Sequence, residues 1–348
     1  MWMQLRGVVA VCVLAAALPA RGAGVEGVGA SFPSQVYAKW AQTFEKATGK
    51  PVRYQPTGSS DGVKQITARA VQFGGSDSPL PPEELAKRQL VQVPMLVGGI
   101  VPVINVQGLG DKRLHLTGEV LAAIMAGEVR HWNDPRIVAL NPGVPLPAHP
   151  IRRVVRADKS GTTEGLTRYL AAVSPAFKRD VGMGQQPTWP GEVERAEGND
   201  GMVRSLKARS GAIAYVSYDR AEQDRLATVK LKNASGNWVT ASEAGFRAAL
   251  LESDVARRGD DAASIIDRPG SASWPITMAS FVLFDAEPAK AQDVNEALRF
   301  LYWCFMRGDD LTRGTGFAPL PTSLQSRLAA RFMAVKPQDG KVPDFLGP

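Results

Sequence analysis

The sequence predicts an α/β protein with two lobes. From Val25 onward, short apolar runs alternate with amphipathic segments, a pattern typical of strands and helices that follow one another along the chain. The chain has 348 residues, which is enough for two domains of ordinary size. Two apolar stretches, Val91–Asn105 and Trp274–Thr277, are candidate crossings between the lobes. If both cross, one lobe is built from the two ends of the chain and the other from its middle.

The first residues have the features of a secretory signal peptide. Arg6 precedes an apolar run over Gly7–Leu18, and small residues follow it up to Gly22 and Ala23. The apolar run is too short to span a bilayer comfortably. We therefore expect residues 1–23 to be removed, with cleavage near Gly22 or Ala23, and the remaining chain to be exported.

Cysteine content and charge restrict the class of protein. Cys12 lies in the predicted signal peptide and lacks the small preceding residue of a lipoprotein signal. Once the signal peptide is removed, Cys304 is the only cysteine, so no intramolecular disulfide or cysteine metal cluster is expected. Export without disulfides favours a bacterial periplasm over an animal secretory route. Beyond residue 23 the chain has 39 basic and 34 acidic residues, a net charge of +5, without a dense basic cluster that would predict nucleic-acid binding.

In the first part of the chain, the alternation predicts five elements before the first crossing. A helix opens at Pro33, which follows Ser31 and Phe32, and stops at Gly49. The further elements are a strand over Pro51–Gln55, a helix over Val63–Val71, a strand over Phe73–Asp77 and a helix over Glu83–Gln89.

The middle and the end of the chain continue the same pattern. The predicted elements are a helix over Leu121–Ala126, a strand over Ile151–Val155, a helix over Thr162–Ala172, a strand over Gly211–Ser217, a strand over Ser280–Phe284 and a helix over Val294–Arg307, with Asp293 as N-cap and Gly308 as stop. Lys336–Pro348 is rich in Pro and Gly and is expected to be loosely ordered. The predicted lobes are residues 24–97 with 272–348, and residues 98–271.

Three Ser/Gly-rich turns that lead into predicted helices are the strongest functional signal. They are Gly29–Pro33, Gly58–Gly62 and Arg156–Thr163. A helix N-terminus presents unpaired backbone N–H groups and the positive end of the helix dipole, and glycine lets a ligand approach the backbone. Each turn alone is also explained by N-capping. Together they predict a site that holds a tetrahedral oxyanion from several sides.

Charged residues in and near these turns restrict which anion the site can bind. Arg156 carries a planar guanidinium that matches two oxygens of a tetrahedral anion, and Asp158 can orient it, although a surface ion pair is the alternative. Asp77 would repel an anion unless the anion carries a proton, as phosphate does near neutral pH and sulfate does not. Asp77 therefore favours phosphate, unless it only caps the turn before Pro79.

The second turn also matches the G-x-S-x-G pattern of a hydrolase nucleophile elbow, with Ser60 as the nucleophile. Such a site needs a later acid and then a histidine, which usually falls near the end of the chain. The histidines are His115, His131 and His149, and no histidine follows. A serine esterase is therefore the weaker hypothesis.

Many ordered motifs give the chain a family resemblance. They are Gly27–Pro33, Val36–Trp40, Gly58–Ser60, Gly62–Ile66, Phe73–Asp77, Arg156–Asp158, Ser160–Thr162, Gly198–Gly201, Gly211–Ile213 and Trp274–Ile276. In these motifs the chain resembles the periplasmic phosphate-binding proteins of the bacterial high-affinity phosphate ABC transporter. Asp61 and Lys159 stand where that family often has glycine, and Ser31 where it often has threonine.

The resemblance implies a two-lobed periplasmic-binding-protein fold of type II, with a mixed sheet in each lobe and two crossover strands. It implies a monomer without cofactor, metal or enzymatic activity, which passes phosphate to the membrane permease subunits. The implied phosphate ligands are Ser31, Phe32, Ser59, Asp77, Arg156, Asp158, Ser160, Gly161 and Thr162. Asp77 would accept a hydrogen bond from the protonated phosphate, and Asp158 would hold Arg156. A receptor for sulfate or molybdate is the alternative within the same class.

Overall fold

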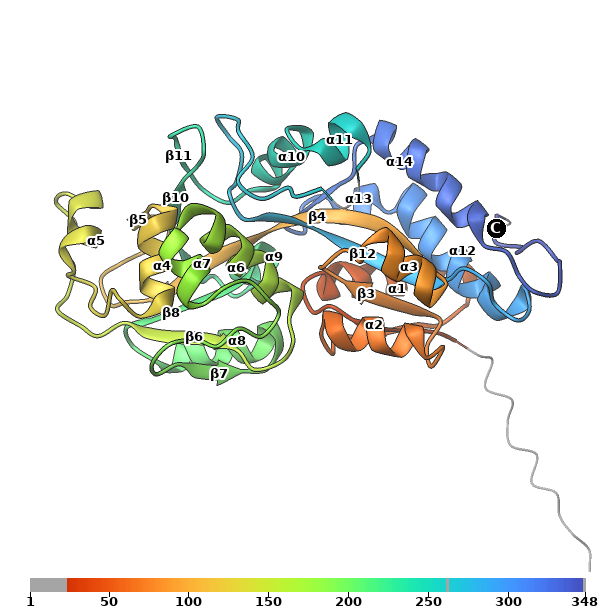
Figure 1. Ribbon diagram of the computed structural model, residues 1–348, viewed down its shortest axis with the longest axis horizontal. Coiled ribbons are helices and arrows are strands. Elements are labelled where there is room, and N and C mark those ends of the chain that lie inside the picture. Colours follow the sequence, from red (N-terminus) through yellow and green to blue (C-terminus); the bar gives the residue numbers. More distant parts are fainter. Residues whose placement is uncertain (1–23, 261–262, 347–348) are drawn as a thin grey trace, which may run out of the picture.

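The computed structural model describes residues 24–260 and 263–346, so the predicted signal peptide, residues 1–23, lies outside the described residues. The described chain forms two masses of strands and helices side by side (Figure 1). One long sheet runs through both. Its strands, in spatial order, are β2 (Val52–Gln55), β1 (Val25–Gly29), β3 (Phe73–Ser76), β12 (Thr277–Asp285), β4 (Leu90–Asn105), β8 (Ala212–Ser217), β6 (Arg152–Arg156) and β7 (Glu194–Ala196).

The long strand β4 joins the two masses. Its first part pairs antiparallel with β12, from Leu90 opposite Asp285 to Gly99 opposite Thr277. Its second part pairs antiparallel with β8, from Ile100 to Asn105. We call the half around β1, β2, β3 and β12 the first lobe, and the half around β6, β7 and β8 the second lobe. The predicted first crossing is therefore a strand shared by both.

The return to the first lobe passes through Trp274, whose side chain is fully buried. Its indole Nε1 donates to the Ile100 carbonyl at 2.9 Å, at the point where β4 changes partner. Ile100 N–H in turn donates to the Ile276 carbonyl at 2.9 Å, and the chain then enters β12 at Thr277. The two links therefore run side by side between the lobes.

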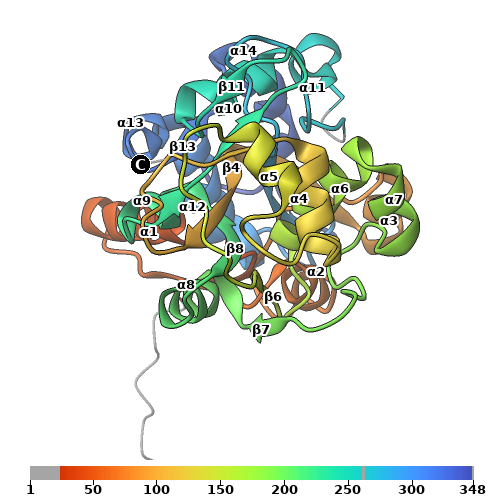
Figure 2. The same ribbon diagram turned by 90° about the vertical axis from the view of Figure 1, so that its left-hand side faces the viewer.

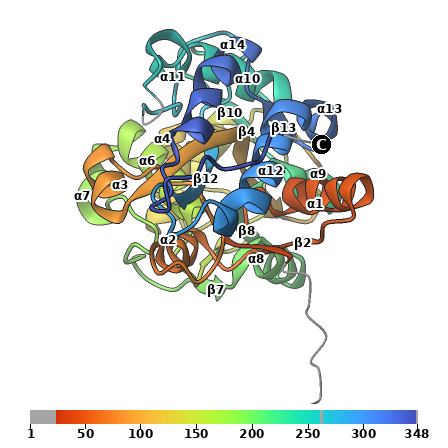
Figure 3. The ribbon, with the colours of Figure 1, turned by 90° about the vertical axis from the view of Figure 1, so that its right-hand side faces the viewer.

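Helices cover the strands of the first lobe on both faces. They are α1 (Ser34–Thr48), α2 (Ser59–Thr67), α3 (Pro82–Arg88), α12 (Gln292–Arg307), α13 (Asp309–Thr312) and α14 (Thr322–Leu328), followed by the 3-10 helix η1 (Ala329–Ala334). Seen from this side, α1 and α2 lie on opposite sides of β12 (Figure 3). Helix α1 buries Val36, Tyr37, Trp40 and Phe44, at the three- and four-residue spacing of one helix face, and ends at Gly49.

The second lobe has the same layered plan. Its helices are α4 (Gly118–Ala126), α5 (Pro135–Leu140), α6 (Gly161–Val173), α7 (Pro175–Asp180), α8 (Gly198–Ala208) and α9 (Tyr218–Gln223). Seen from this side, α4 and α6 lie on one side of β6 and β8, and α8 lies on the other (Figure 2).

Smaller elements complete the fold. A second sheet has the order β11 (Trp238–Val239), β10 (Lys230–Lys232), β5 (His115–Leu116), and β9 (Ala227–Thr228) and β13 (Phe317–Pro319) add to β4. Helices α10 (Glu243–Leu251) and α11 (Asp254–Arg258) lie along the top of Figure 1. Among the residues described, no helix combines the length and apolarity needed to cross a bilayer.

Some predicted boundaries are wrong. Helix α2 begins at Ser59, four residues before the predicted start. Asp293 is not an N-cap, because α12 begins at Gln292 and the Asp293 carboxylate instead accepts from Lys290 N–H. The tail up to residue 346 has no helix or strand after η1, yet Phe345 is buried and packs edge-on against Tyr302 at 5.5 Å. This contact holds the tail against α12.

Candidate anion-binding site

The three Ser/Gly-rich turns meet between the two lobes. Gly58 N–H donates to the Gly29 carbonyl at 2.7 Å, which joins the first turn to the second. A Cβ placed on Gly58 would lie 3.1 Å from the Lys159 carbonyl oxygen, which brings the third turn against the second. The turns follow the carboxyl ends of β1, β2 and β6, the edge at which open α/β sheets place ligands.

Gly161, at the start of α6, lies at a point where the two lobes approach each other closely. A Cβ at this position would lie 2.6 Å from both the Asp77 Cβ and the Ser59 Oγ, closer than side-chain atoms approach one another. Glycine therefore lets the N-terminus of α6, in the second lobe, approach the two polar residues of the first lobe. The backbone N–H groups of this helix end face the same region.

Asp77 lies at the centre of a buried polar cluster. Its backbone N–H donates to Ser59 Oγ at 3.1 Å, and Ser280 Oγ donates to Asp77 Oδ1 at 2.8 Å. Burial raises the pKa of Asp77 to about 7, although the Ser280 hydrogen bond and the charge of Arg156 act in the opposite direction. Asp77 can therefore exchange a proton near neutral pH.

Arg156 is held rigidly by Asp158. Arg156 Nε donates to Asp158 Oδ1 at 2.7 Å, and Arg156 Nη2 donates to Asp158 Oδ2, so the pair is bidentate. Gly198 N–H also donates to Asp158 Oδ1, at 3.0 Å. Burial alone would raise the pKa of Asp158, but the hydrogen bond and charge of Arg156 outweigh burial and lower it. The carboxylate therefore stays ionised and fixes the guanidinium plane.

Several buried polar atoms have no hydrogen-bond partner among residues 24–260 and 263–346, and three of them belong to residues of the predicted turns. These three are Ser31 Oγ, Arg156 Nη1 and Thr162 Oγ1. All three can donate a hydrogen bond, and they come from both lobes. Leaving a buried donor unsatisfied costs about 1–3 kcal/mol. An oxyanion between the lobes would satisfy all three at once.

The remaining predicted residues have structural roles that are visible in the fold. Ser160 Oγ accepts from Thr163 N–H at 3.2 Å and so caps α6. Phe32 is fully buried, and its ring packs edge-on against Phe317 at 5.0 Å, which anchors the first turn. For Ser160, N-capping and a contact to an anion are compatible, since the hydroxyl can donate while it accepts.

Ser280 and Asn199 contact residues of the candidate site, although no functional role was predicted for either. Ser280 comes from β12, and no motif surrounds it. Asn199 lies in α8, where its Nδ2 donates to the Ser31 carbonyl at 3.4 Å and to Ser217 Oγ at 3.2 Å. Its position in a Gly-Asn-Asp-Gly motif was the one signal that could have pointed to it.

The geometry does not support a nucleophile elbow at Ser60. The histidines are engaged elsewhere: His115 stacks on Trp238 at 4.7 Å, and His131 and His149 both contact Pro150. Among the described residues, no hydrogen bond joins Ser60 to a histidine. In that same part of the chain, no group of three His, Cys, Asp or Glu side chains is placed to hold a metal ion.

Comparison with known proteins identifies the family. The chain matches the PBP superfamily domain over residues 15–306. It is 38% identical to phosphate-binding protein PstS of Haemophilus influenzae, over 90% of this chain and 93% of that protein. The PstS protein of Pasteurella multocida is also 38% identical, over 93% and 94% of the two chains. This chain belongs to the PstS family of phosphate-binding proteins.

Solved structures agree with this assignment at the level of the fold. A periplasmic phosphate-binding protein, PfluDING, solved with phosphate bound, superimposes with a TM-score of 0.69 at 22% identity, over 88% of this chain and 93% of that one. A phosphate-binding protein of Stenotrophomonas maltophilia gives a TM-score of 0.67 at 20% identity, with the same coverage. The predicted PstS resemblance and the two-lobed α/β fold are confirmed.

Proposed function

We propose that this PstS-family chain binds inorganic phosphate in the cleft between its lobes and delivers it to the permease of an ABC transporter. The observation that carries the proposal is a set of three buried donors from the predicted turns, Ser31 Oγ, Arg156 Nη1 and Thr162 Oγ1, none of which has a hydrogen-bond partner among the described residues. Donors alone would suit any oxyanion. The buried carboxylate of Asp77 adds the acceptor that a protonated anion needs.

Each predicted ligand has a distinct role in this proposal. Ser31 and Thr162 donate from their hydroxyls, Phe32 and Gly161 donate from their backbone N–H groups, and Arg156 donates from Nη1. Ser59 and Ser160 complete the shell, and Asp158 acts through Arg156 without contacting the anion. Ser280 and Asn199 position Asp77 and the Ser31 turn.

Selection against sulfate follows from the proton balance at Asp77. Because the pKa of Asp77 is about 7, either Asp77 or the phosphate can carry a proton around neutral pH. A hydrogen bond can therefore form between one carboxylate oxygen of Asp77 and one phosphate oxygen. Sulfate brings no proton. It would face the carboxylate oxygen directly unless Asp77 itself is protonated, at a cost in desolvation and repulsion.

The proposal includes the organisation of the mature protein. Residues 1–23 act as a signal peptide for export to the periplasm, residues 24–97 with 272–348 form the first lobe, and residues 98–271 form the second. The protein acts as a monomer, not as an enzyme, and uses no cofactor. Closure of the lobes over phosphate would present a surface to the permease that the open form lacks.

Calorimetry with phosphate, arsenate, sulfate and molybdate tests this function. We expect saturable binding of phosphate at one ion per chain, binding of arsenate, and much weaker binding of sulfate and molybdate. Ser60→Ala tests the esterase alternative, because it removes the hydroxyl of the proposed nucleophile and leaves Ser59 in place. Phosphate binding that survives this substitution, without turnover of a chromogenic ester, supports the receptor. Hydrolysis that Ser60→Ala abolishes would refute it.

A further inference from the structure

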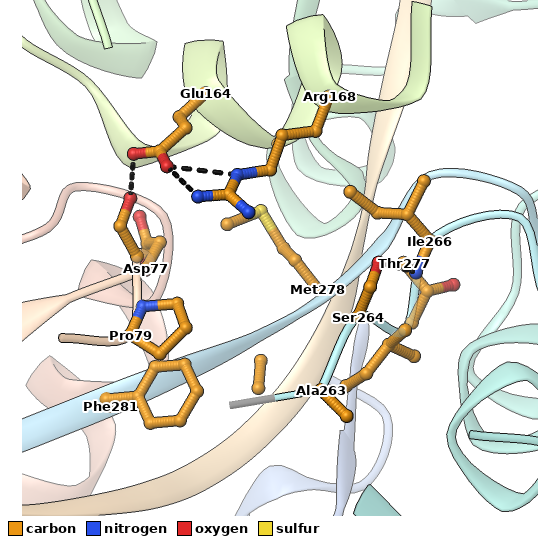
Figure 4. Close-up of a pocket in the computed structure, with 14 residues that line it drawn as sticks. Asp77, Pro79, Glu164, Arg168, Ala263, Ser264, Ile266, Thr277, Met278 and Phe281 are labelled. Atoms are coloured by element: carbon orange, nitrogen blue, oxygen red, sulfur yellow. Dashed lines mark hydrogen bonds and ion pairs between the residues drawn. The ribbon is translucent and has the colours of Figure 1, made fainter. Parts of the chain in front are cut away.

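A second polar contact joins the lobes beside the proposed phosphate site. Ser78, the residue after Asp77 in the first lobe, donates from Oγ to Glu164 Oε2 on helix α6 of the second lobe. The same hydroxyl accepts from Gln185 Nε2 at 3.3 Å, also in the second lobe. Figure 4 shows Glu164 and Arg168 on α6 facing Asp77 and Pro79 of the first lobe. None of these side chains belongs to the proposed ligand shell, apart from Asp77.

Arg168 fixes the orientation of Glu164. One turn further along α6, Arg168 Nε donates to Glu164 Oε1 at 3.0 Å, and Nη2 donates to the same oxygen. The other oxygen, Oε2, is left for Ser78. The Glu164 side chain is only 14% exposed, and the Arg168 side chain is half-exposed. The hydrogen bond from Ser78 is therefore charge-assisted and largely shielded from water.

Glu164 remains ionised under the conditions in which Asp77 titrates. Burial alone would raise the pKa of Glu164, but the hydrogen bonds from Ser78 and Arg168 outweigh burial and hold it below its usual value. Its charge is in turn one of the influences that raise the pKa of Asp77. A second carboxylate beside an anion site weakens anion binding by repulsion, unless an interaction made by that carboxylate stabilises the closed form by a comparable amount.

We propose that Ser78, Glu164 and Gln185 form an interlobe latch, oriented by Arg168, that holds the cleft closed on the Asp77 side and sets the residence time of the bound anion. The inference rests on the proposed function, because the anion in question is phosphate. The stabilisation from the hydrogen bond between Ser78 and Glu164 exists only in the closed form, because Ser78 moves away from Glu164 when the lobes separate. Glu164 is thus a positioning residue: it holds the two lobes together and does not contact the anion.

A simpler interpretation is that Glu164 and Arg168 form an ordinary helix-surface ion pair. The chain contains a matched example of such a pair, Glu84 and Arg88 on α3, with the same four-residue spacing and a 2.8 Å contact. That pair lies within the first lobe. Pairs of this kind contribute little to stability when exposed. Glu84→Ala therefore removes the same type of interaction without touching the latch.

The test compares Ser78→Ala, Glu164→Ala, their double variant and the control Glu84→Ala. Phosphate association and dissociation rates are measured by stopped-flow fluorescence, and thermal unfolding confirms that each variant folds. Ser78→Ala and Glu164→Ala are each expected to raise the dissociation rate about tenfold, the effect of losing a charge-assisted hydrogen bond. Association should change little, because the anion enters the open form. The double variant should be no faster than the faster single variant, and Glu84→Ala should match wild type.

Ser78→Ala separates the latch from simple charge repulsion, because it keeps the Glu164 charge. An unchanged dissociation rate in Ser78→Ala, or tighter binding in Glu164→Ala, would overturn the latch. If wild type does not bind phosphate, the proposed function fails, and the latch is tested by small-angle X-ray scattering. The two single variants should then have a larger radius of gyration than wild type, and equal radii would overturn it.

Discussion

At the scale of single residues, Arg156 carries the largest expected effect. Its Nη1 is buried and has no hydrogen-bond partner among the described residues, whereas its Nε and Nη2 both donate to Asp158. Arg156→Ala removes the cation and leaves Asp158 with its bond from Gly198, a buried carboxylate without its counter-charge. We expect phosphate affinity to fall by at least 2 kcal/mol, roughly thirtyfold, in calorimetry.

Arg195→Ala is the control for Arg156→Ala, because this neighbouring arginine on β7 is exposed and its loss changes the net charge equally. It should bind phosphate as wild type does. An Arg156→Ala variant with an unchanged dissociation constant would place the binding site elsewhere in the molecule.

Asp77 makes the stability of the ligand-free protein depend on pH. Its pKa is raised by burial from 3.8 to about 7 in the folded chain. Below pH 3.8 the carboxyl group is protonated in both the folded and unfolded states, so its burial does not lower the free energy of unfolding through ionisation. As pH rises toward 7, the unfolded state ionises freely while the folded state resists, and the free energy of unfolding falls by up to about 1.4 kcal/mol per pH unit.

Asp77→Asn removes this titration. We therefore expect the stability of Asp77→Asn, relative to wild type, to increase from pH 4 to pH 7 and to level off above that. Chemical denaturation at a series of pH values measures the difference. The comparison cancels Asp219, whose pKa burial also raises to about 7. A difference that does not vary with pH would contradict the account of Asp77.

At the scale of elements, the N-terminus of α6 is expected to control closure through Gly161. An alanine there would press its Cβ against Asp77 and Ser59, each 2.6 Å away, so the second lobe could not approach the first as closely. We expect Gly161→Ala to weaken phosphate binding more than tenfold with little change in the melting temperature, because the two lobes can part to relieve the clash.

Gly184→Ala provides the matched control for Gly161→Ala. A Cβ at Gly184 meets no atom within 4 Å, so binding and melting temperature should both stay at wild-type values. If Gly161→Ala bound phosphate normally, the close approach of α6 to Asp77 would not be required for binding.

The sequence predicted long elements better than their ends. Helix α1 has a regular apolar face and a glycine stop, so its range was nearly correct. Helix α2 begins at Ser59 because Gly58, with a φ of 106°, ends the preceding loop there. The first turn of α2 contains Ser, Asp and Gly, residues typical of loops, and this composition hid its start. The role of Ser280 was not predictable, since it depends on the pairing of β12 with β3 far along the chain.

At the scale of the whole molecule, the first crossing was predictable because it is long and apolar. Strand β4 is buried along most of its length, and this explains an apolar run too long for an ordinary strand. The predicted loose tail was wrong for Phe345, since its composition of Pro and Gly gave no sign that one aromatic residue packs on Tyr302. Local composition indicates flexibility, whereas a single buried ring can still fix a segment.

Closure of the lobes on one phosphate ion is the central claim, and a scattering titration tests it most directly. Small-angle X-ray scattering of the mature chain, with phosphate added stepwise, should show a radius of gyration that falls and saturates at one phosphate per chain. Equal concentrations of sulfate should leave the radius unchanged. A radius that does not respond to phosphate, or that responds equally to sulfate, would contradict the account.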